Sequence, residues 1–272
     1  MRPAIATVCS LEAPLGTVLD DYAAGHVDAV DLWLGHVDAF VKEAGVAALR
    51  DRLGSAGIAP VAASFQGGLL TSQGDARREH WRHFEERLVL CRDLGVPVLV
   101  IAGDAFGPLG EQDLGRLSAS LVEAARRGAD AGVRLALEFD ARASFPNNLQ
   151  SAVAVVEQVG SPALGLGHEW EHFPGGPSKP LDLWLLTNDT LAHVQLSDVA
   201  DVPREMAADA DRILPGEGAS PPDDLVSRLR EIGYAGAVAV ELLNPALWRV
   251  PPRQFGEIAM TALRKVLGQA SM

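Results

Sequence analysis

The sequence has few of the residues that membrane, redox or disulfide-rich proteins depend on. It contains two cysteines, Cys9 and Cys91, and no Cys-x-x-Cys pair, which excludes a disulfide framework and a redox motif. Both thiols are therefore expected to be buried apolar side chains. The apolar runs are too short to cross a bilayer, and charges or glycines interrupt them. We expect no membrane partner.

Positive charge is also scarce. The 23 lysines and arginines are outnumbered by 36 acidic residues, which gives a net charge of −13. No basic patch stands out, so nucleic acid is not an expected partner. Lysine itself occurs only as Lys42, Lys179 and Lys265, and none of these lies at the end of an expected strand. That placement disfavours an aldolase that would use a lysine Schiff base.

The first residues lack the features of an export signal. The apolar stretch after Met1 is short, and Leu11-Glu12-Ala13-Pro14 breaks it early. The stretch is better explained as a first strand. We therefore expect a cytoplasmic protein.

What the sequence does contain is a repeated alternation of two patterns. Eight short apolar segments occur, each followed by a stretch with apolar residues at helical spacing, as in 117–126. The expected strands cover residues 4–8, 28–34, 58–64, 97–103, 134–139, 163–169, 191–197 and 237–242.

This alternation predicts an α/β protein with parallel strands joined by helices. Eight units in about 250 residues is the size of a (β/α)₈ TIM barrel, which we expect to form one domain over residues 1–272. A doubly wound open sheet is the alternative. It would need a glycine-rich phosphate loop after the first strand, and Val8-Cys9-Ser10-Leu11 is not one.

The last four expected strands each end in a polar residue. Side chains alternate between the two faces of a strand, so the small residues Ala136, Gly167 and Ala239 should share the barrel interior with the polar residue that follows two positions later. Because the carboxyl ends of the strands meet at one edge, these polar side chains should converge. They are Glu138, Glu169, Gln195 and Glu241.

Three converging carboxylates repel one another unless a cation lies among them. Together with one amide oxygen they form an all-oxygen ligand set, which suits Mg²⁺ or Mn²⁺ and can also accept Co²⁺ or Zn²⁺. A single glutamate at a strand end is more often solvated or caps the next helix. Four polar residues at the ends of consecutive strands, all facing the same side, favour a site for one divalent metal ion instead.

Two further residues are candidates for contact with substrate. His172 lies three residues after Glu169, although a histidine in a loop is often only a surface group. Arg212 lies in a long proline- and glycine-containing loop, residues 198–222, that we expect to close over the site. The alternative for Arg212 is a surface ion pair with Asp209 or Asp211.

These segments resemble the xylose-isomerase-like TIM-barrel superfamily of sugar isomerases, epimerases and dehydratases, over essentially the whole chain. The matching segments are Leu135–Glu138, Gly165–His172, His193–Asp198, Arg212–Gly218 and Val240–Asn244.

The resemblance implies roles for individual residues. Glu138, Glu169, Gln195 and Glu241 match the metal ligands, while His172 and Arg212 match residues on the substrate side. Two positions depart from the usual pattern. Glu169 stands where the family usually has aspartate, and Gln195 replaces the more common histidine, as it does in hydroxypyruvate isomerases and bacterial 3-dehydroshikimate dehydratases.

The expected function is proton transfer next to a carbonyl of a keto-sugar, a polyol or a related acid. A divalent metal would stabilise the enediolate, with Glu138 and Glu241 as base and acid. Return of the proton to the neighbouring carbon gives an isomerase, and return to the opposite face of the same carbon gives an epimerase. Loss of a β-hydroxyl gives a lyase such as 3-dehydroshikimate dehydratase.

Two other classes were weighed. A DNA-repair endonuclease of the same superfamily needs extra histidine ligands on earlier strands, and Ala63-Ser64-Phe65-Gln66 and Ala102-Gly103-Asp104 contain none. A non-catalytic binding protein would have lost Glu138 or Glu241, and both are present. The sequence leaves substrate, metal and a homo-oligomeric state open.

Overall fold

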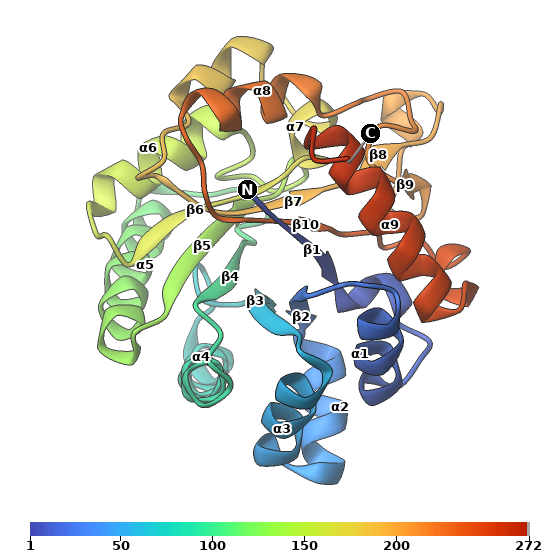
Figure 1. Ribbon diagram of the computed structural model, residues 1–272. Coiled ribbons are helices and arrows are strands. Elements are labelled where there is room, and N and C mark those ends of the chain that lie inside the picture. The colour runs from blue at the N-terminus through green and yellow to red at the C-terminus, as the bar shows by residue number, and fades with distance from the viewer. Residues whose placement is uncertain (271–272) are drawn as a thin grey trace. The chain divides into compact units, whose positions relative to one another are not determined.

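The computed structural model describes residues 1–270 (Figure 1). The contacts between residues divide the chain into two compact units. The first unit contains residues 1–63 and 194–272, and the second contains residues 64–193. The expectation that residues 1–272 form one domain stays a prediction.

The main sheet is a closed barrel with the strand order β1-β10-β7-β6-β5-β4-β3-β2. Every pair of strands in it whose register is defined is parallel. This confirms the predicted (β/α)₈ fold class. An open doubly wound sheet is excluded because β1 pairs with both β2 and β10.

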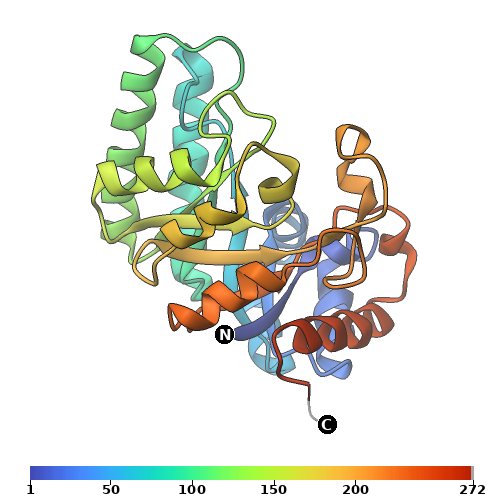
Figure 2. The same ribbon diagram turned by 90° about the horizontal axis from the view of Figure 1, so that it is seen from above.

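In the first unit, three strands of the barrel and five helices lie wholly within its residues. Helix α9 packs against α1, as both views show (Figures 1 and 2). The strands are β1 (Arg2–Ala6), β2 (Ala29–Trp33) and β10 (Ala237–Val240), and the helices are α1 (Leu15–Ala24), α2 (Leu34–Ala44), α3 (Val46–Ala56), α8 (Asp223–Glu231) and α9 (Pro252–Val266). Strands β3 (Ala59–Gln66) and β7 (Leu191–Leu196) each contribute residues to both units.

The second unit alternates strands and helices in sequence order. Its strands pair in register from Val98↔Arg134 onward. The elements are α4 (Gly74–Leu94), β4 (Val98–Gly103), α5 (Glu111–Ala131), β5 (Arg134–Phe139), α6 (Leu149–Val159), β6 (Leu164–Glu169), the short α7 (His172–Gly175) and the 3₁₀ segment η2 (Pro180–Leu185). Left-handed glycines end the two long helices, Gly95 after α4 and Gly132 after α5, at φ of 73° and 71°.

The loop after β7 is more ordered than the sequence suggested. It contains an antiparallel pair, β8 (Asp198–Val199) with β9 (Arg212–Ile213). Two 3₁₀ turns, η3 (Arg204–Met206) and η4 (Asp209–Asp211), lie between these strands, and η1 (Thr7–Ser10) and η5 (Leu247–Arg249) lie elsewhere in the same unit.

The predicted strands agree with the observed ones within about two residues. The fifth agrees at both ends, residues 134–139. The first was predicted over residues 4–8 but covers Arg2–Ala6, because the chain turns into a 3₁₀ helix at Thr7. There the Thr7 hydroxyl accepts a hydrogen bond from the backbone of Trp33 at 2.9 Å, which the hydropathy pattern could not reveal.

Small side chains fill the barrel interior below the candidate site residues. In the first unit Ala4, Ala29, Val61 and Ala239 form one buried cluster, with Ala237 packed against it. In the second unit, a Cβ added at Gly167 would lie 3.3 Å from that of Ala136. Both observations agree with the predicted phase of the strands.

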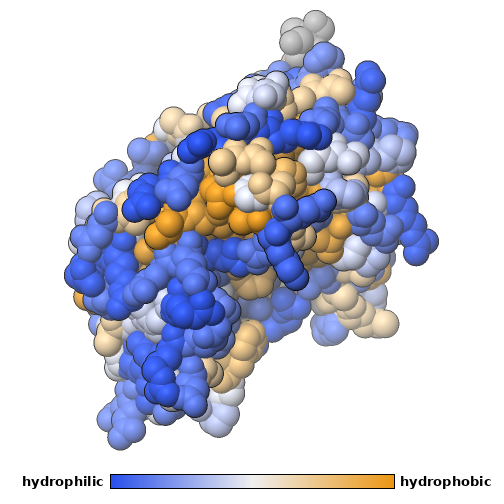
Figure 3. Space-filling view, turned by 90° about the horizontal axis from the view of Figure 1, so that it is seen from below, coloured by the Kyte–Doolittle hydropathy of each residue, from blue (hydrophilic) through white to orange (hydrophobic). Residues whose placement is uncertain are grey.

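The face in Figure 3 is largely hydrophilic, with apolar side chains gathered toward its middle. Among residues 1–270, no helix is both long enough and apolar enough to cross a membrane.

Candidate active site

Glu241 follows directly after β10, on the face that carries Ala237 and Ala239. Its backbone is held on both sides. Its own amide donates to the carbonyl of Leu196 at 3.1 Å. The thiol of Cys9 lies between the two neighbouring residues, 3.4 Å from the carbonyl of Val240 and 3.2 Å from the amide of Leu242. The carboxylate is thus presented from rigid backbone.

Gln195 joins two carboxylates in the first unit. It pairs with Ala239 across β7 and β10, and therefore faces the same side as Glu241. Its Nε2 donates to Glu241 Oε1 at 2.8 Å and to Asp31 Oδ2 at 3.1 Å. All three side chains are almost fully buried. A shared amide donor lets two carboxylates lie close together with less repulsion.

Arg212 belongs to the same group. Its guanidinium is only 2% exposed, with Nη1 3.5 Å from Glu241 Oε2 and Nη2 2.9 Å from Asp209 Oδ1. The ion pair with Asp209 that was considered as an alternative is present, but the arginine itself is buried rather than on the surface. Asn244 donates to the carbonyl of Arg212 at 2.9 Å and fixes its backbone.

Asp198 organises the loop that follows Arg212. This fully buried carboxylate accepts four backbone hydrogen bonds between 2.8 and 3.2 Å. A Cβ at Gly218 would collide with the Asp198 carboxylate, so only glycine fits there. The donors are the amides of Val199, Gly216, Gly218 and Ser220.

In the second unit, His172 meets the carboxylate of Glu138. Nε2 of the imidazole lies 3.3 Å from Glu138 Oε1, and Nδ1 lies 3.0 Å from Glu171 Oε2. Burial alone would lower the pKa of His172, but its hydrogen bonds and the charges of Glu138 and Glu171 raise that pKa to about 10. The side chain is therefore a cation at neutral pH.

His168 behaves in the opposite way. It is fully buried among Phe139, Trp170 and Phe173. Burial, together with the charge of His172, lowers its pKa to about 3. The two histidines four residues apart therefore differ in charge because only one of them contacts carboxylates.

Glu169 ends β6 with no exposed surface. Its Oε1 accepts the backbone N–H of Glu171 at 3.1 Å. This hydrogen bond ties the strand end to the turn that leads into α7. Glu169 and His172 are thereby held by one short segment of chain.

The structure brings the candidate residues together in two groups. Gln195, Glu241 and Arg212 are in contact in the first unit, and Glu138 and His172 are in contact in the second. The residues predicted from the sequence did not include three polar partners, Asp31, Glu171 and Asp198. The first of these had a detectable signal, since an aspartate in the apolar strand Ala29-Val-Asp-Leu-Trp33 is unusual.

The donor chemistry suits a hard divalent cation, because each group presents carboxylate oxygens and Gln195 adds an amide oxygen. In residues 1–270, however, no three His, Cys, Asp or Glu side chains are arranged so that they could hold a metal ion. The Gln195 amide directs its nitrogen at Glu241 and occupies that carboxylate with a hydrogen bond. Rotation of the amide by half a turn would present its oxygen instead.

A closed barrel of eight parallel strands connected by helices defines the TIM-barrel class of proteins. Within that class, this chain belongs to the xylose isomerase-like TIM barrel family, whose model matches residues 22–265.

Known relatives point in the same direction. The inosose isomerase of Halalkalibacterium halodurans is 35% identical over 120 residues, 44% of this chain and 43% of that protein. The inosose isomerase of Bacillus velezensis is 27% identical over 198 residues, 72% of this chain and 71% of that protein. The first alignment thus spans less than half of the relative. These similarities support an enzyme of the sugar isomerase and epimerase type.

A solved structure matches the fold along the whole chain. The IOLI protein with a bound zinc atom superposes with a TM-score of 0.92 at 22% identity and covers 100% of both chains. At that identity the likeness establishes the fold.

Proposed function

We propose that this protein is a metal-dependent isomerase of inososes, which are six-membered polyol rings carrying one ketone. The observation that carries the proposal is Glu241, a buried carboxylate held at a strand end by Gln195 and Arg212. A carboxylate fixed in this way suits proton transfer to and from carbon. The similarity to curated inosose isomerases supports the choice of substrate.

The reaction needs one base and one acid beside the substrate. The base removes the proton from the hydroxyl-bearing carbon next to the ketone, the electron pair of that C–H bond forms a carbon–carbon double bond, and the acid protonates the carbonyl oxygen to give an enediol. Return of a proton to the former carbonyl carbon, with loss of the proton of the neighbouring hydroxyl, leaves the ketone one ring position away. We assign the two proton transfers to Glu138 and Glu241.

The positions of these two carboxylates are set by their neighbours. Glu138 receives a hydrogen bond from the cationic His172 in one unit, and Glu241 receives one from Gln195 in the other. We also propose that His172 contacts substrate oxygens, which requires one of its N–H groups to leave Glu138 or Glu171. Buried Arg212 can donate two parallel hydrogen bonds to an oxygen pair.

We further propose that Glu138, Glu169, Gln195 and Glu241 hold the metal. Its support is the all-oxygen donor set and the closed parallel barrel, in which strand ends share one edge. A bound divalent ion supplies Lewis-acid stabilisation of negative charge on the substrate oxygens. The identity of the ion, Mg²⁺, Mn²⁺, Co²⁺ or Zn²⁺, is left to measurement.

A dehydratase acting on an acid such as 3-dehydroshikimate is the second candidate. The buried guanidinium of Arg212 favours it, because a planar fork is well suited to a substrate carboxylate. In that reaction the same deprotonation is followed by loss of a β-hydroxyl. The substrate of either candidate enzyme is a small molecule.

The test is an activity screen on protein stripped with a chelator and reloaded with one metal at a time. Substrates should include two inososes, a neutral ketose, hydroxypyruvate and 3-dehydroshikimate. We expect turnover of an inosose that chelation abolishes and one divalent ion restores. Full activity in the stripped protein would overturn metal dependence, and turnover of 3-dehydroshikimate alone would replace the isomerase with the dehydratase.

A further inference from the structure

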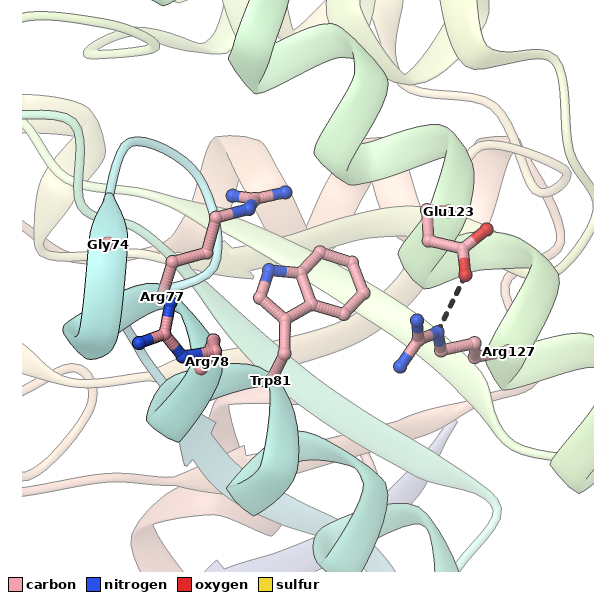
Figure 4. A pocket seen from close by; sticks show the side chains of 6 residues that line it. All are labelled: Gly74, Arg77, Arg78, Trp81, Glu123 and Arg127. Carbon is pink, nitrogen blue, oxygen red and sulfur yellow. Dashed lines mark hydrogen bonds and ion pairs between the residues drawn. The ribbon is translucent and has the colours of Figure 1, made fainter.

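A pocket of about 420 Å³ lies between helices α4 and α5 of the second unit (Figure 4). It uses none of the residues of the candidate active site. Three arginines, one tryptophan and one glutamate supply its side chains. The lining residues are Gly74, Arg77, Arg78, Trp81, Glu123 and Arg127.

Trp81 forms the centre of this pocket. The guanidinium carbon of Arg77 lies 5.1 Å from the centre of its ring, and that of Arg127 lies 4.7 Å away. The side chain is 9% exposed. Among residues 1–270 its indole Nε1 has no hydrogen-bond acceptor, although it is buried. A buried donor without an acceptor costs about 1–3 kcal/mol, so a ligand oxygen at this position would remove a penalty.

The two ends of the pocket differ in charge. Arg127 is already neutralised, because it donates to Glu123 at 2.7 Å and forms an ion pair with Glu85. Glu123 also receives hydrogen bonds from Arg126, and these arginines lower its pKa to about 2. This end therefore carries no unpaired positive charge.

Arg77 is different. Its guanidinium donates to two neutral acceptors, the carbonyl of Leu69 at 3.1 Å and the hydroxyl of Ser120 at 3.0 Å. Within residues 1–270 it has no carboxylate partner. Burial and the nearby charge of Arg116 lower the pKa of Arg77. An arginine has five N–H donors, so three remain after these two bonds.

We propose that this end of the pocket is a binding site for a small oxyanion, a phosphate or a carboxylate. Its oxygens would accept hydrogen bonds from Arg77 and from Trp81 Nε1. Arg78 occupies the next position of α4, with its side chain 76% exposed and already ion-paired with Asp75.

The geometry limits the ligand to one anionic group. Glu123 lies in the same pocket at the Arg127 end and would repel a second negative charge. It can instead accept a hydrogen bond from a ligand hydroxyl. The ligand class is therefore a monoester of phosphate or a hydroxy acid, with its anionic group toward Arg77.

The test is titration calorimetry of the intact protein with inorganic phosphate and, separately, with glycolate, a hydroxy acid with one carboxylate, at low ionic strength. Variants Arg77→Gln, Arg78→Gln and Trp81→Phe address the site. Arg92→Gln is the matched control, since Arg92 is an exposed arginine of α4 paired with Asp93. Thermal melting checks the fold of each variant, and binding needs neither metal nor substrate.

We expect one saturable site, with affinity lowered about tenfold in Arg77→Gln and severalfold in the other two site variants. Affinity should be unchanged in Arg92→Gln. Preference for phosphate or glycolate decides between the two anion types. Absence of saturable binding for both anions would overturn the proposal, as would equal weakening by Arg92→Gln. If Arg77→Gln fails to fold, unchanged binding in the exposed Arg78→Gln and in Trp81→Phe would also overturn it.

Discussion

The amide nitrogen of Gln195 lies 2.8 Å from Oε1 of Glu241. This contact joins two of the four proposed metal ligands. Both side chains are buried. Replacement of either one therefore leaves a buried polar atom of the other without its hydrogen bond, which costs stability. Asp31 shares the same nitrogen and extends the cluster to β2.

Replacing Glu138 or Glu241 with glutamine should abolish proton transfer while keeping the fold, because the two side chains are nearly isosteric. General acid–base catalysis contributes about 10²–10⁴-fold, so kcat should fall by about that factor in each variant. Kinetics on the substrate found by the screen measure it. Wild-type turnover in either variant would remove that residue from the mechanism.

A matched control is Glu231→Gln. Glu231 ends α8, and its side chain is 51% exposed in an ion pair with Arg228. Its replacement should leave both kcat and the melting temperature unchanged, because exposed ion pairs contribute about 0–1 kcal/mol. A comparable loss of kcat in this control would indicate a general effect of lowering negative charge.

The strands and their phase were predictable because they depend on hydropathy at spacing two. Ala239 and Gln195 share a face as predicted, and β5 has the predicted bounds. The partners of the candidate residues were not predictable. Asp31 lies 164 positions from Gln195, and no local pattern links them.

The loop 198–222 is a second region whose structure could not be fully predicted from the sequence. Its prolines and glycines indicated irregular structure, but not the antiparallel pair of β8 and β9. That pair depends on hydrogen bonds between residues far apart in the loop and on the buried Asp198.

Arg212→Lys should distinguish the two candidate substrates. Lysine keeps the positive charge near Glu241 but cannot offer the planar pair of donors. On an acidic substrate KM should rise about tenfold or more, because a charge-assisted hydrogen bond contributes about 1.5–3 kcal/mol. On a neutral inosose KM should change much less. Equal effects on both substrates would assign Arg212 to holding Glu241 rather than to recognising a carboxylate.

Stability should decrease in mild acid partly because of His36, which is buried with Nε2 3.1 Å from the carbonyl of Leu11. Burial lowers its pKa, an effect that the Leu11 carbonyl partly opposes. Because the pKa of His36 is lower in the folded state, neutral His36 contributes its full stability above its unfolded-state pKa of about 6.5. This contribution is lost as pH falls toward the folded-state pKa.

The measurement is urea unfolding at pH 8 and pH 5.5 for the wild type and for His36→Gln. Glutamine can still donate to Leu11 but does not titrate. The variant should lose less stability between the two pH values than the wild type does. An identical loss in both proteins would show that other groups control the acid response.

Asp198→Asn should loosen the loop that carries Arg212. One carboxylate now accepts four backbone N–H groups, and the amide nitrogen of asparagine would face some of those donors. Hydrogen exchange at Gly216, Gly218 and Ser220 should therefore quicken, with a loss of about 1–3 kcal/mol of stability. The exposed Asp201 provides the matched control Asp201→Asn, which should leave exchange unchanged. Unaltered protection of these amides in Asp198→Asn would mean that the loop is held by other contacts.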